Sequence, residues 1–523
     1  MVCHPWWRGG VFYQIYPRSF CDSNGDGIGD LEGVRSRLDH LAWLGVDALW
    51  LSPVFPSPGA DGGYDVSHYC DIDPVFGDIA AFDRLVAAAH ARGLRVLLDW
   101  VPNHTSVQHP WFHSSRRDPD GPHANWYWWA DKPLNNWSSA FGGPAWTYDE
   151  ARGQYYLHLF TAAQPDLNWN EPGVQDAMFD TLRFWLDRGV DGFRADVVHL
   201  VGRDPALKDV APRAEPGLND LVNSYRDPRT HEVLRKVRGL LDSYPGERMM
   251  IGEVSLEESA DVVTYLGTSE DPELHLAFDF SLLEAPWDAE VWRACIAGAE
   301  IAHAPVETSP TWVLSSHDAS RHRTRYGGSE AAARVAAVLL LTLRGAAFLY
   351  AGEELGLQDA TVGRERSRAP LGRDPSRAPI PWTIEEPHGW TGSQSWLPWP
   401  PDPGCHNPQA LRRERGGILW LYRRLLELRR TTPALAHGDL ELLDSPPGTL
   451  AYRRSLPRAT ETAVTVVANF ASTHRLVPYD GAVLLESSAP DRRGALVQPS
   501  TRQLLLAPFT AAVMREPMPH RPG

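Results

Sequence analysis

The sequence predicts an α/β protein whose main part is a closed (β/α)8 TIM barrel. Two observations support this prediction. Short apolar runs with the composition of β-strands alternate with segments whose apolar residues recur at helical spacing. Four of these runs are followed closely by acidic residues. Because a parallel barrel places its chemistry at the carboxyl ends of its strands, we expect one site built from loops that are distant in the chain.

The expected strands and helices alternate from the start of the chain. The strands are predicted at residues 11–20, 48–53, 94–98, 192–196, 249–252, 276–280, 312–315 and 346–350. The helices are predicted at residues 34–44, 80–92, 174–188, 229–243 and 331–343. Strands alternating with helices favour a closed barrel over an open doubly wound sheet. A dinucleotide-binding fold is disfavoured, because its characteristic Gly-x-Gly-x-x-Gly turn does not follow the first strand.

Two segments depart from this alternation. Residues 105–166 are rich in Trp, Pro, Asn and Gly, which predicts a small subdomain inserted after the third strand. From residue 437 short alternating runs replace the helices, which predicts a C-terminal antiparallel β-sandwich domain. We therefore expect the barrel at residues 1–104 plus 167–436, an inserted subdomain B at 105–166 and the β-sandwich at 437–523.

Charge and cysteine usage exclude several kinds of partner. With 50 Lys and Arg against 66 Asp and Glu, the net charge of -16 and the lack of a basic tract predict no nucleic acid and no acidic membrane as partners. The five cysteines lack paired metal-ligand spacing and fit a reducing cytosol. The N-terminus does not resemble a signal peptide, and no apolar run is long enough to span a bilayer. We expect a soluble, cytoplasmic protein.

The acids at the predicted strand ends are Asp99, Asp196, Glu253 and Asp318. Paired carboxylates in a cleft suit glycosidic bond cleavage, because one attacks or stabilises the anomeric carbon while the other protonates the leaving oxygen. Arg194 lies two residues before Asp196, on the same face of the strand, where its charge favours the ionised carboxylate. The spacing leaves open whether the reaction would retain or invert stereochemistry.

Four segments, in order, resemble the four signature regions of the α-amylase family of glycoside hydrolases. They are residues 99–104 (DWVPNH), 192–196 (GFRAD), 252–254 (GEV) and 316–318 (SHD). The resemblance covers the predicted barrel, and a β domain downstream is also typical of that family. It implies a retaining mechanism with Asp196 as nucleophile, Glu253 as general acid/base and Asp318 as the carboxylate that fixes the sugar. Asp99 is then expected to orient its neighbours.

The resemblance also implies how the sugar pocket closes. Gly63-Tyr64-Asp65-Val66 is similar to the segment that supplies a stacking tyrosine and a carboxylate at the non-reducing end of the pocket. The expected partner of Asp65 is Arg373, which we prefer to Arg377. A pocket closed by such a pair implies exo-action on one terminal glucose.

Further substrate contacts are expected from neighbouring positions. His104 and His317 resemble the family's hydrogen-bond donors to glucose in the first subsite. Phe160 and Arg194 are also expected to bind the substrate. Val197, directly after the predicted nucleophile, resembles members that act on α-1,6 bonds, but one residue leaves the linkage open.

An Asp- and Gly-rich loop follows the first predicted strand. Residues 22–30, DSNGDGIGD, alternate oxygen ligands with glycines, as a tight loop around a hard cation requires. The loop lacks the later Glu of an EF-hand and resembles the single metal loop of the α-glucosidase branch. The resemblance implies one structural Ca2+ or Mg2+, held by the side chains of Asp22, Asn24, Asp26 and Asp30 and the carbonyl of Ile28. The alternative is a turn without a metal.

Three functions remain open at this point. Gln164-Pro-Asp-Leu-Asn168 resembles the mark of the oligo-1,6-glucosidase and α-glucosidase branch, which implies short substrates. Together with the expected pocket closure and the cysteine usage, this favours a cytosolic exo-acting α-glucosidase for maltose, isomaltose or short oligosaccharides. The first alternative is a transglycosylase or isomerase that rearranges sucrose or maltose through the same covalent intermediate. The second is a non-catalytic binding paralogue. Linkage preference and oligomeric state do not follow from the sequence.

Overall fold

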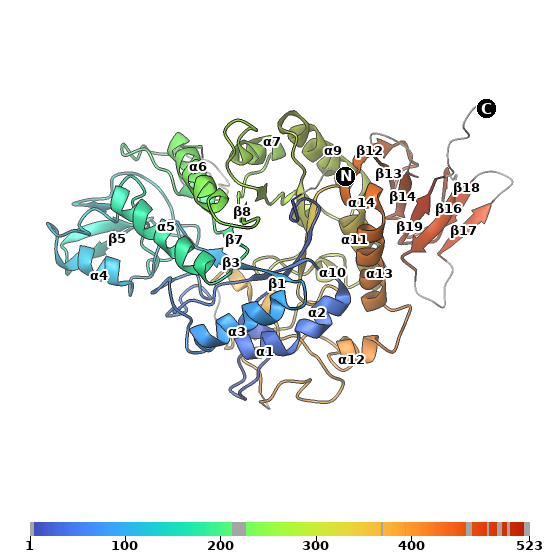
Figure 1. Cartoon of the computed structure of the whole chain (residues 1–523), viewed down its shortest axis with the longest axis horizontal. Helices are drawn as coiled ribbons and strands as arrows, with labels where there is room; N and C mark the ends of the chain where they lie inside the picture. The colour runs from blue at the N-terminus through green and yellow to red at the C-terminus, as the bar shows by residue number, and fades with distance from the viewer. Residues whose placement is uncertain are drawn as a thin grey trace.

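The computed structural model confirms the predicted barrel and the antiparallel β structure that follows it (Figure 1). It describes residues 5–211, 226–363, 365–367, 370–392, 394–456, 463–478, 481–488, 494–498 and 503–516. Eight parallel strands lie in the order β10-β11-β1-β2-β3-β7-β8-β9. A parallel bridge between Asp279 and Trp312 links the two ends of this order, and the amide of Asp279 donates to the carbonyl of Thr311 (3.0 Å). The sheet is therefore closed.

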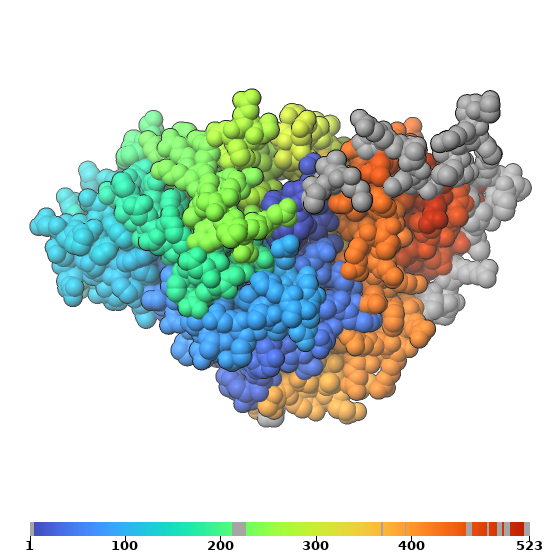
Figure 2. All heavy atoms as spheres, in the orientation of Figure 1, coloured from blue at the N-terminus to red at the C-terminus, as the bar shows by residue number. Residues whose placement is uncertain are grey.

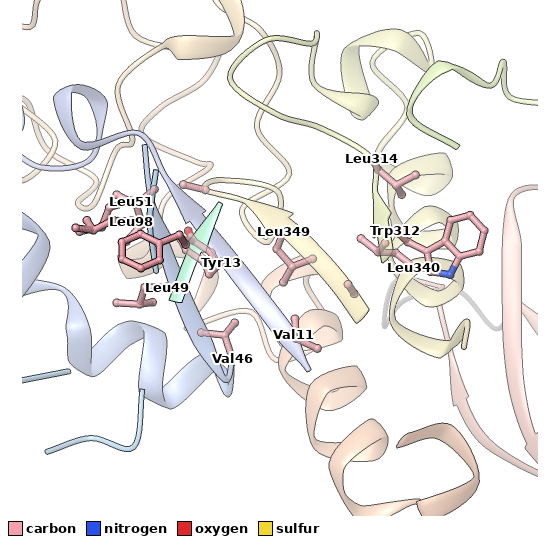
Figure 3. Packing of buried hydrophobic residues seen from close by; sticks show 14 of the residues in the cluster. Val11, Tyr13, Val46, Leu49, Leu51, Leu98, Trp312, Leu314, Leu340 and Leu349 are labelled. Carbon is pink, nitrogen blue, oxygen red and sulfur yellow. The ribbon is translucent and has the colours of Figure 1, made fainter. Parts of the chain in front are cut away.

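All eight predicted barrel strands are present. Their bounds are β1 Val11–Ile15, β2 Ala48–Leu51, β3 Arg95–Trp100, β7 Gly192–Ala195, β8 Met249–Gly252, β9 Leu276–Ala277, β10 Thr311–Val313 and β11 Ala346–Tyr350. In β1 the side chains alternate. Val11 and Tyr13 pack outward beside Leu49 and Leu349, as Figure 3 shows, whereas Phe12 packs in a separate cluster with residues of the other strands. Because every second residue of a strand faces the interior, a polar residue at such a position places its side chain inside the barrel.

Most of the helices cover the outside of the barrel, whereas the helix at Pro110–Arg117 packs against Trp129 and Tyr156 of the inserted segment. Their bounds are α1 Leu31–Ser36, α2 Leu38–Leu44, α3 Ile79–His90, α4 Pro110–Arg117, α5 Pro172–Asp187, α6 Pro228–Asp242, α7 Ser259–Val262, α8 Ser281–Glu284, α9 Ala289–His303, α10 His322–Arg325, α11 Glu330–Thr342, α12 Pro408–Leu411, α13 Ile418–Thr431 and α14 Pro433–His437. The single helix predicted at residues 34–44 is wrong, because Arg37 has non-helical angles and separates α1 from α2. The sequence did not reveal the start of α1, where the Asp30 side chain accepts a hydrogen bond from Gly33.

Two further β structures lie at opposite ends of the molecule (Figures 1 and 2). Between β3 and α5, the strands β4 Trp129–Ala130, β5 Trp146–Asp149 and β6 Gln154–Leu157 form a small sheet in the order β4-β6-β5. After α14 come β12 Asp439–Leu443, β13 Thr449–Ser455, β14 Val464–Asn469, β15 Arg475–Pro478, β16 Ala482–Glu486, β17 Ala495–Gln498, β18 Gln503–Leu506 and β19 Thr510–Arg515. They form sheets ordered β12-β13-β14-β19-β16 and β15-β18-β17. Val477 and Leu504 pack against Ala512 and Met514 between these sheets. The exact domain boundaries stay a prediction.

Within the described ranges, no helix has the length and apolar character needed to cross a membrane. The thiols of Cys21, Cys70, Cys295 and Cys405 are free. Cys3 lies outside the described residues.

Candidate active site

Three of the four strand-end acids line one pocket. Asp196 follows β7, Glu253 follows β8 and Asp318 lies in the loop after β10. The pocket has a volume of about 340 Å³, near the lower end of the range for small-ligand sites. It is lined by Asp61, Tyr64, His104, Ala140, Phe141, Phe160, Asp196, Val197, Glu253, Asp318, Leu371 and Arg373. Asp99 lies inside β3 and is fully buried, so it contributes to the site through its neighbours.

Arg194 joins the carboxylates beneath the pocket. Its Nη1 donates to Asp196 Oδ1 (2.7 Å) and to Asp99 Oδ1 (2.8 Å), and its Nη2 donates to Glu253 Oε2. The side chain is only 3% exposed, because it points into the barrel and lies against the ring of Trp50, 5.2 Å from the ring centroid. One buried cation therefore holds three acids at once.

This sharing sets the electrostatics of the predicted nucleophile. Burial raises the pKa of Asp196 well above its usual range; Arg194 opposes the shift, while Glu253 and Asp99 add to it. Burial likewise raises the pKa of Asp99 to about 6, against the effect of Arg194. Burial lowers the pKa of Arg194, but the surrounding carboxylates outweigh it and raise that pKa. The charge of Arg194 therefore does not bring the pKa of Asp196 back to the usual range of an aspartate.

Tyr64 and His317 connect these acids to Asp318. Burial lowers the pKa of His317, so its imidazole is neutral near pH 7. The amide of Gln14 lies 2.7 Å from His317 Nδ1, which identifies Nδ1 as the acceptor and Nε2 as the protonated nitrogen. That nitrogen lies 2.7 Å from the Tyr64 hydroxyl and 3.0 Å from Asp318 Oδ2. The Tyr64 hydroxyl in turn donates to Asp99 Oδ2 (3.0 Å).

Asp318 faces cations on its other side. Its Oδ1 accepts from Arg373 Nη1 (2.7 Å) and from Arg377 Nη2 (2.8 Å). Burial raises the pKa of Asp318, but the hydrogen bond with His317 Nε2 and the charges of Arg377 and Arg373 together lower it well below its usual range. This carboxylate is ionised over the whole neutral range and remains about 36% exposed, so it can accept hydrogen bonds from a sugar.

The expected pairing of Asp65 with Arg373 is wrong. Asp65 is fully buried, and its carboxylate accepts from the Ser57 hydroxyl (2.7 Å) and the amides of Ala60 (2.9 Å) and Asp61 (3.1 Å). It shapes its own loop and does not line the pocket. Besides Asp318, Arg373 pairs with Asp61, through an ion pair that closes one wall of the pocket.

His104 and Phe160 form a second wall. Their rings lie 5.1 Å apart, and both side chains line the pocket. Burial lowers the pKa of His104 to about 3, which keeps this imidazole neutral. The amide of Gln164 lies 3.0 Å from His104 Nε2 and donates to Asp61 Oδ2 (3.1 Å). The 164–168 motif therefore reaches the acid that closes the pocket.

Val197 adopts an unusual backbone conformation. Its φ of 35° lies in the left-handed region, which a β-branched residue rarely occupies. This geometry lets its amide donate to Glu253 Oε2 (3.1 Å), and its side chain lines the pocket. Arg194 and Val197 thus contact the same carboxylate oxygen and fix the position of Glu253.

In the predicted cation loop, the carboxylates are turned onto the loop itself. Asp22 accepts from the amides of Gly25 (2.6 Å) and Gly27 (3.1 Å), and Asp30 accepts from Gly33 (2.6 Å) as the cap of α1. Nowhere in the described residues do three acidic, histidine or cysteine side chains gather as a metal site. Whether the loop binds a hard cation, which takes six or more oxygen ligands, stays a prediction.

Four pocket residues were not found from the sequence. Asp61 lies in the same loop as Asp65, and only the long-range contact with Arg373 distinguishes the two acids. Ala140, Phe141 and Leu371 lie in loops without periodic patterns, so no local signal marks them.

Comparisons with known proteins agree with this geometry. The family model described as Alpha amylase, catalytic domain, matches residues 14–438. A probable alpha-glucosidase of Rhizobium meliloti (strain 1021) is 41% identical over 484 residues, which cover 86% of this chain and 87% of that protein. An oligo-1,6-glucosidase of Parageobacillus thermoglucosidasius is 34% identical, with 89% and 90% covered.

Two solved structures have the same overall fold. The alpha-glucosyl transfer enzyme XgtA superposes with a TM-score of 0.89 at 38% identity, covering 98% of this chain and 100% of the other. The trehalulose synthase MutB from Pseudomonas mesoacidophila MX-45 gives a TM-score of 0.89 at 32% identity, with the same coverage.

Proposed function

This chain belongs to the α-amylase family of glycoside hydrolases, and we propose from this premise that it is an exo-acting, retaining α-glucosidase. Its substrates are short oligosaccharides with a terminal α-linked glucose, of the maltose or isomaltose type. The observation that carries the proposal is the pocket that holds Asp196, Glu253 and Asp318 and is walled by the Asp61–Arg373 ion pair. Such a wall leaves room for a chain end and excludes a polymer that runs through.

The reaction follows from the placement of these groups. Asp196 attacks the anomeric carbon of the terminal glucose, the bond to the leaving oxygen breaks, and Glu253 gives that oxygen its proton. Water then attacks the glucosyl–Asp196 ester while Glu253 takes up a proton from it. Asp318, which is ionised, binds sugar hydroxyl groups and stabilises the positive charge that develops on the ring.

The shared arginine supports retention of stereochemistry. Retaining glycosidases have carboxyl groups about 5–5.5 Å apart, whereas inverting enzymes separate them by about 6.5–9.5 Å to admit a water molecule. Asp196 and Glu253 are each hydrogen bonded to the same guanidinium group. This common contact favours the closer spacing.

The second candidate is glucosyl transfer or isomerisation, supported by the similarity to the alpha-glucosyl transfer enzyme XgtA and to the trehalulose synthase MutB. Both reactions share the covalent intermediate, and they differ only in whether water or a sugar hydroxyl attacks it. A panel of α-1,4-, α-1,6- and α-1,3-linked disaccharides and sucrose, with products separated by chromatography at high sugar concentration, tests both. Free glucose as the main product supports the α-glucosidase. If new disaccharides are the main product, the transferase becomes the better proposal. Failure to cleave any α-glucoside would favour the binding paralogue.

Two further properties belong to the proposal. A structural Ca2+ or Mg2+, held by the side chains of Asp22, Asn24, Asp26 and Asp30 and the carbonyl of Ile28, is supported by the alternation of oxygen ligands and glycines in this loop. A cytoplasmic location is supported by the free thiols of the described cysteines.

A further inference from the structure

One wall of the pocket differs in chemistry from its acidic floor. The apolar side chains of Phe141, Phe160, Val197 and Leu371 line the same cavity as the acids. The rings of Phe141 and Phe160 lie 6.0 Å apart, and Phe160 continues to His104 at 5.1 Å. An apolar collar therefore lies next to the groups that bind and cleave the sugar.

Leu371 is the exposed member of this collar. The residue is 73% exposed, and its backbone has a φ of 58°, in the left-handed region that leucine disfavours. The turn is held in place two residues later, where Arg373 pairs with Asp61 and Asp318 and lies over the ring of Phe141. An apolar side chain kept in a disfavoured conformation beside a catalytic pocket indicates a role in binding.

We propose that Leu371, together with Phe141, binds the leaving group of the substrate and selects α-glucosides whose aglycone has an apolar or aromatic face. The proposal rests on the function given above, since a glucose ring held among Asp196, Glu253 and Asp318 leaves the aglycone at the exposed side of the pocket. An aryl group that covers Leu371 removes apolar surface from water, and this strengthens its binding. A second sugar places hydroxyl groups there, and losing water from them against an apolar wall is unfavourable unless a hydrogen bond replaces it.

The test compares two substrates in the same variants. The variants are Leu371→Asn, which tolerates the left-handed backbone but removes the apolar face, Leu371→Phe, which restores an apolar face, and Leu134→Asn as the control. Leu134 is 50% exposed and does not line the pocket. For each protein, kcat and KM are measured on p-nitrophenyl α-glucoside and on maltose or isomaltose, whichever the wild-type enzyme cleaves faster.

The expected result is a change in the ratio of kcat/KM between the two substrates. In Leu371→Asn the aryl-to-disaccharide ratio falls about 5- to 10-fold, mainly through a higher KM for the aryl glucoside. Leu371→Phe keeps the wild-type ratio, and so does Leu134→Asn. An unchanged ratio in Leu371→Asn, or an equal loss on both substrates, would overturn the role of Leu371 while leaving the proposed function intact. A wild-type protein that cleaves neither substrate would overturn the proposed function and this inference with it.

Discussion

Replacement of Arg194 by methionine tests how the acids of the site are held. The arginine is 3% exposed, and its partners Asp99, Asp196 and Glu253 are 0%, 9% and 16% exposed. Methionine keeps much of the volume but leaves three acids without their shared cation. Removing one partner of a buried ion pair costs about 3–5 kcal/mol, because the remaining charge stays desolvated.

The loss of stability in Arg194→Met should depend on pH. Without the cation, the pKa values of Asp99 and Asp196 rise further above their unfolded values. A carboxyl group whose folded pKa is raised contributes stability that is present below its unfolded pKa and lost as the pH rises through its folded pKa. We therefore expect the deficit of Arg194→Met to grow from pH 5 to pH 8, by up to about 1.4 kcal/mol per pH unit for each group that titrates there.

Urea unfolding followed by circular dichroism and tryptophan fluorescence at pH 5, 6, 7 and 8 measures this deficit. Because the chain contains more than one unit, midpoints are compared between proteins at each pH. The midpoint of Arg194→Met at pH 8 should lie about 1 M or more below that of the wild type. Arg183→Met, which removes an exposed 2.6 Å pair with Asp180, is the control and should cost about 0–1 kcal/mol without a pH trend. A deficit equal at pH 5 and pH 8, or no larger than that of the control, would refute the reasoning.

Four further predictions concern catalysis and the cation. Asp196→Asn should lower kcat by at least about 10³-fold with an unchanged circular dichroism spectrum, and retained activity would exclude Asp196 as nucleophile. Because burial raises the pKa of Asp196, kcat/KM should fall on the acid side with a midpoint above about 3.9, the pKa of an ordinary aspartate. A midpoint below this value would contradict the raised pKa. Arg373→Ala should lower kcat/KM on disaccharides about 10- to 100-fold, since it leaves Asp61 unpaired, and Arg35→Ala, which removes an exposed pair with Glu32, should not. Chelation should lower the melting temperature of the wild type, and Ca2+ or Mg2+ should restore it; a melting temperature insensitive to both would remove the cation from the proposal.

Local patterns in the sequence predicted the barrel and the position of each acid. Strand and helix periodicity records which side chains are buried, so β7 and the acid that follows it could be located without any tertiary information. The helical pattern of residues 34–44 also recorded burial, but it could not show the break at Arg37, because the helical spacing of buried apolar residues continues across it in Val34, Leu38 and Leu41.

Contacts between distant residues were decided only by the tertiary structure. Asp61 and Asp65 lie in one loop, and the turn of that loop directs Asp65 onto its own backbone and Asp61 toward Arg373, 312 residues away. The sharing of Arg194 among three acids likewise arises where three strands meet. Leu371 also lines the pocket only because the fold brings the segment after β11 to it. The sequence by itself determined which chemical groups stand at the ends of the strands, because burial leaves a periodic pattern along the chain. The fold decided which of them meet, because a pair formed across the barrel leaves no such pattern.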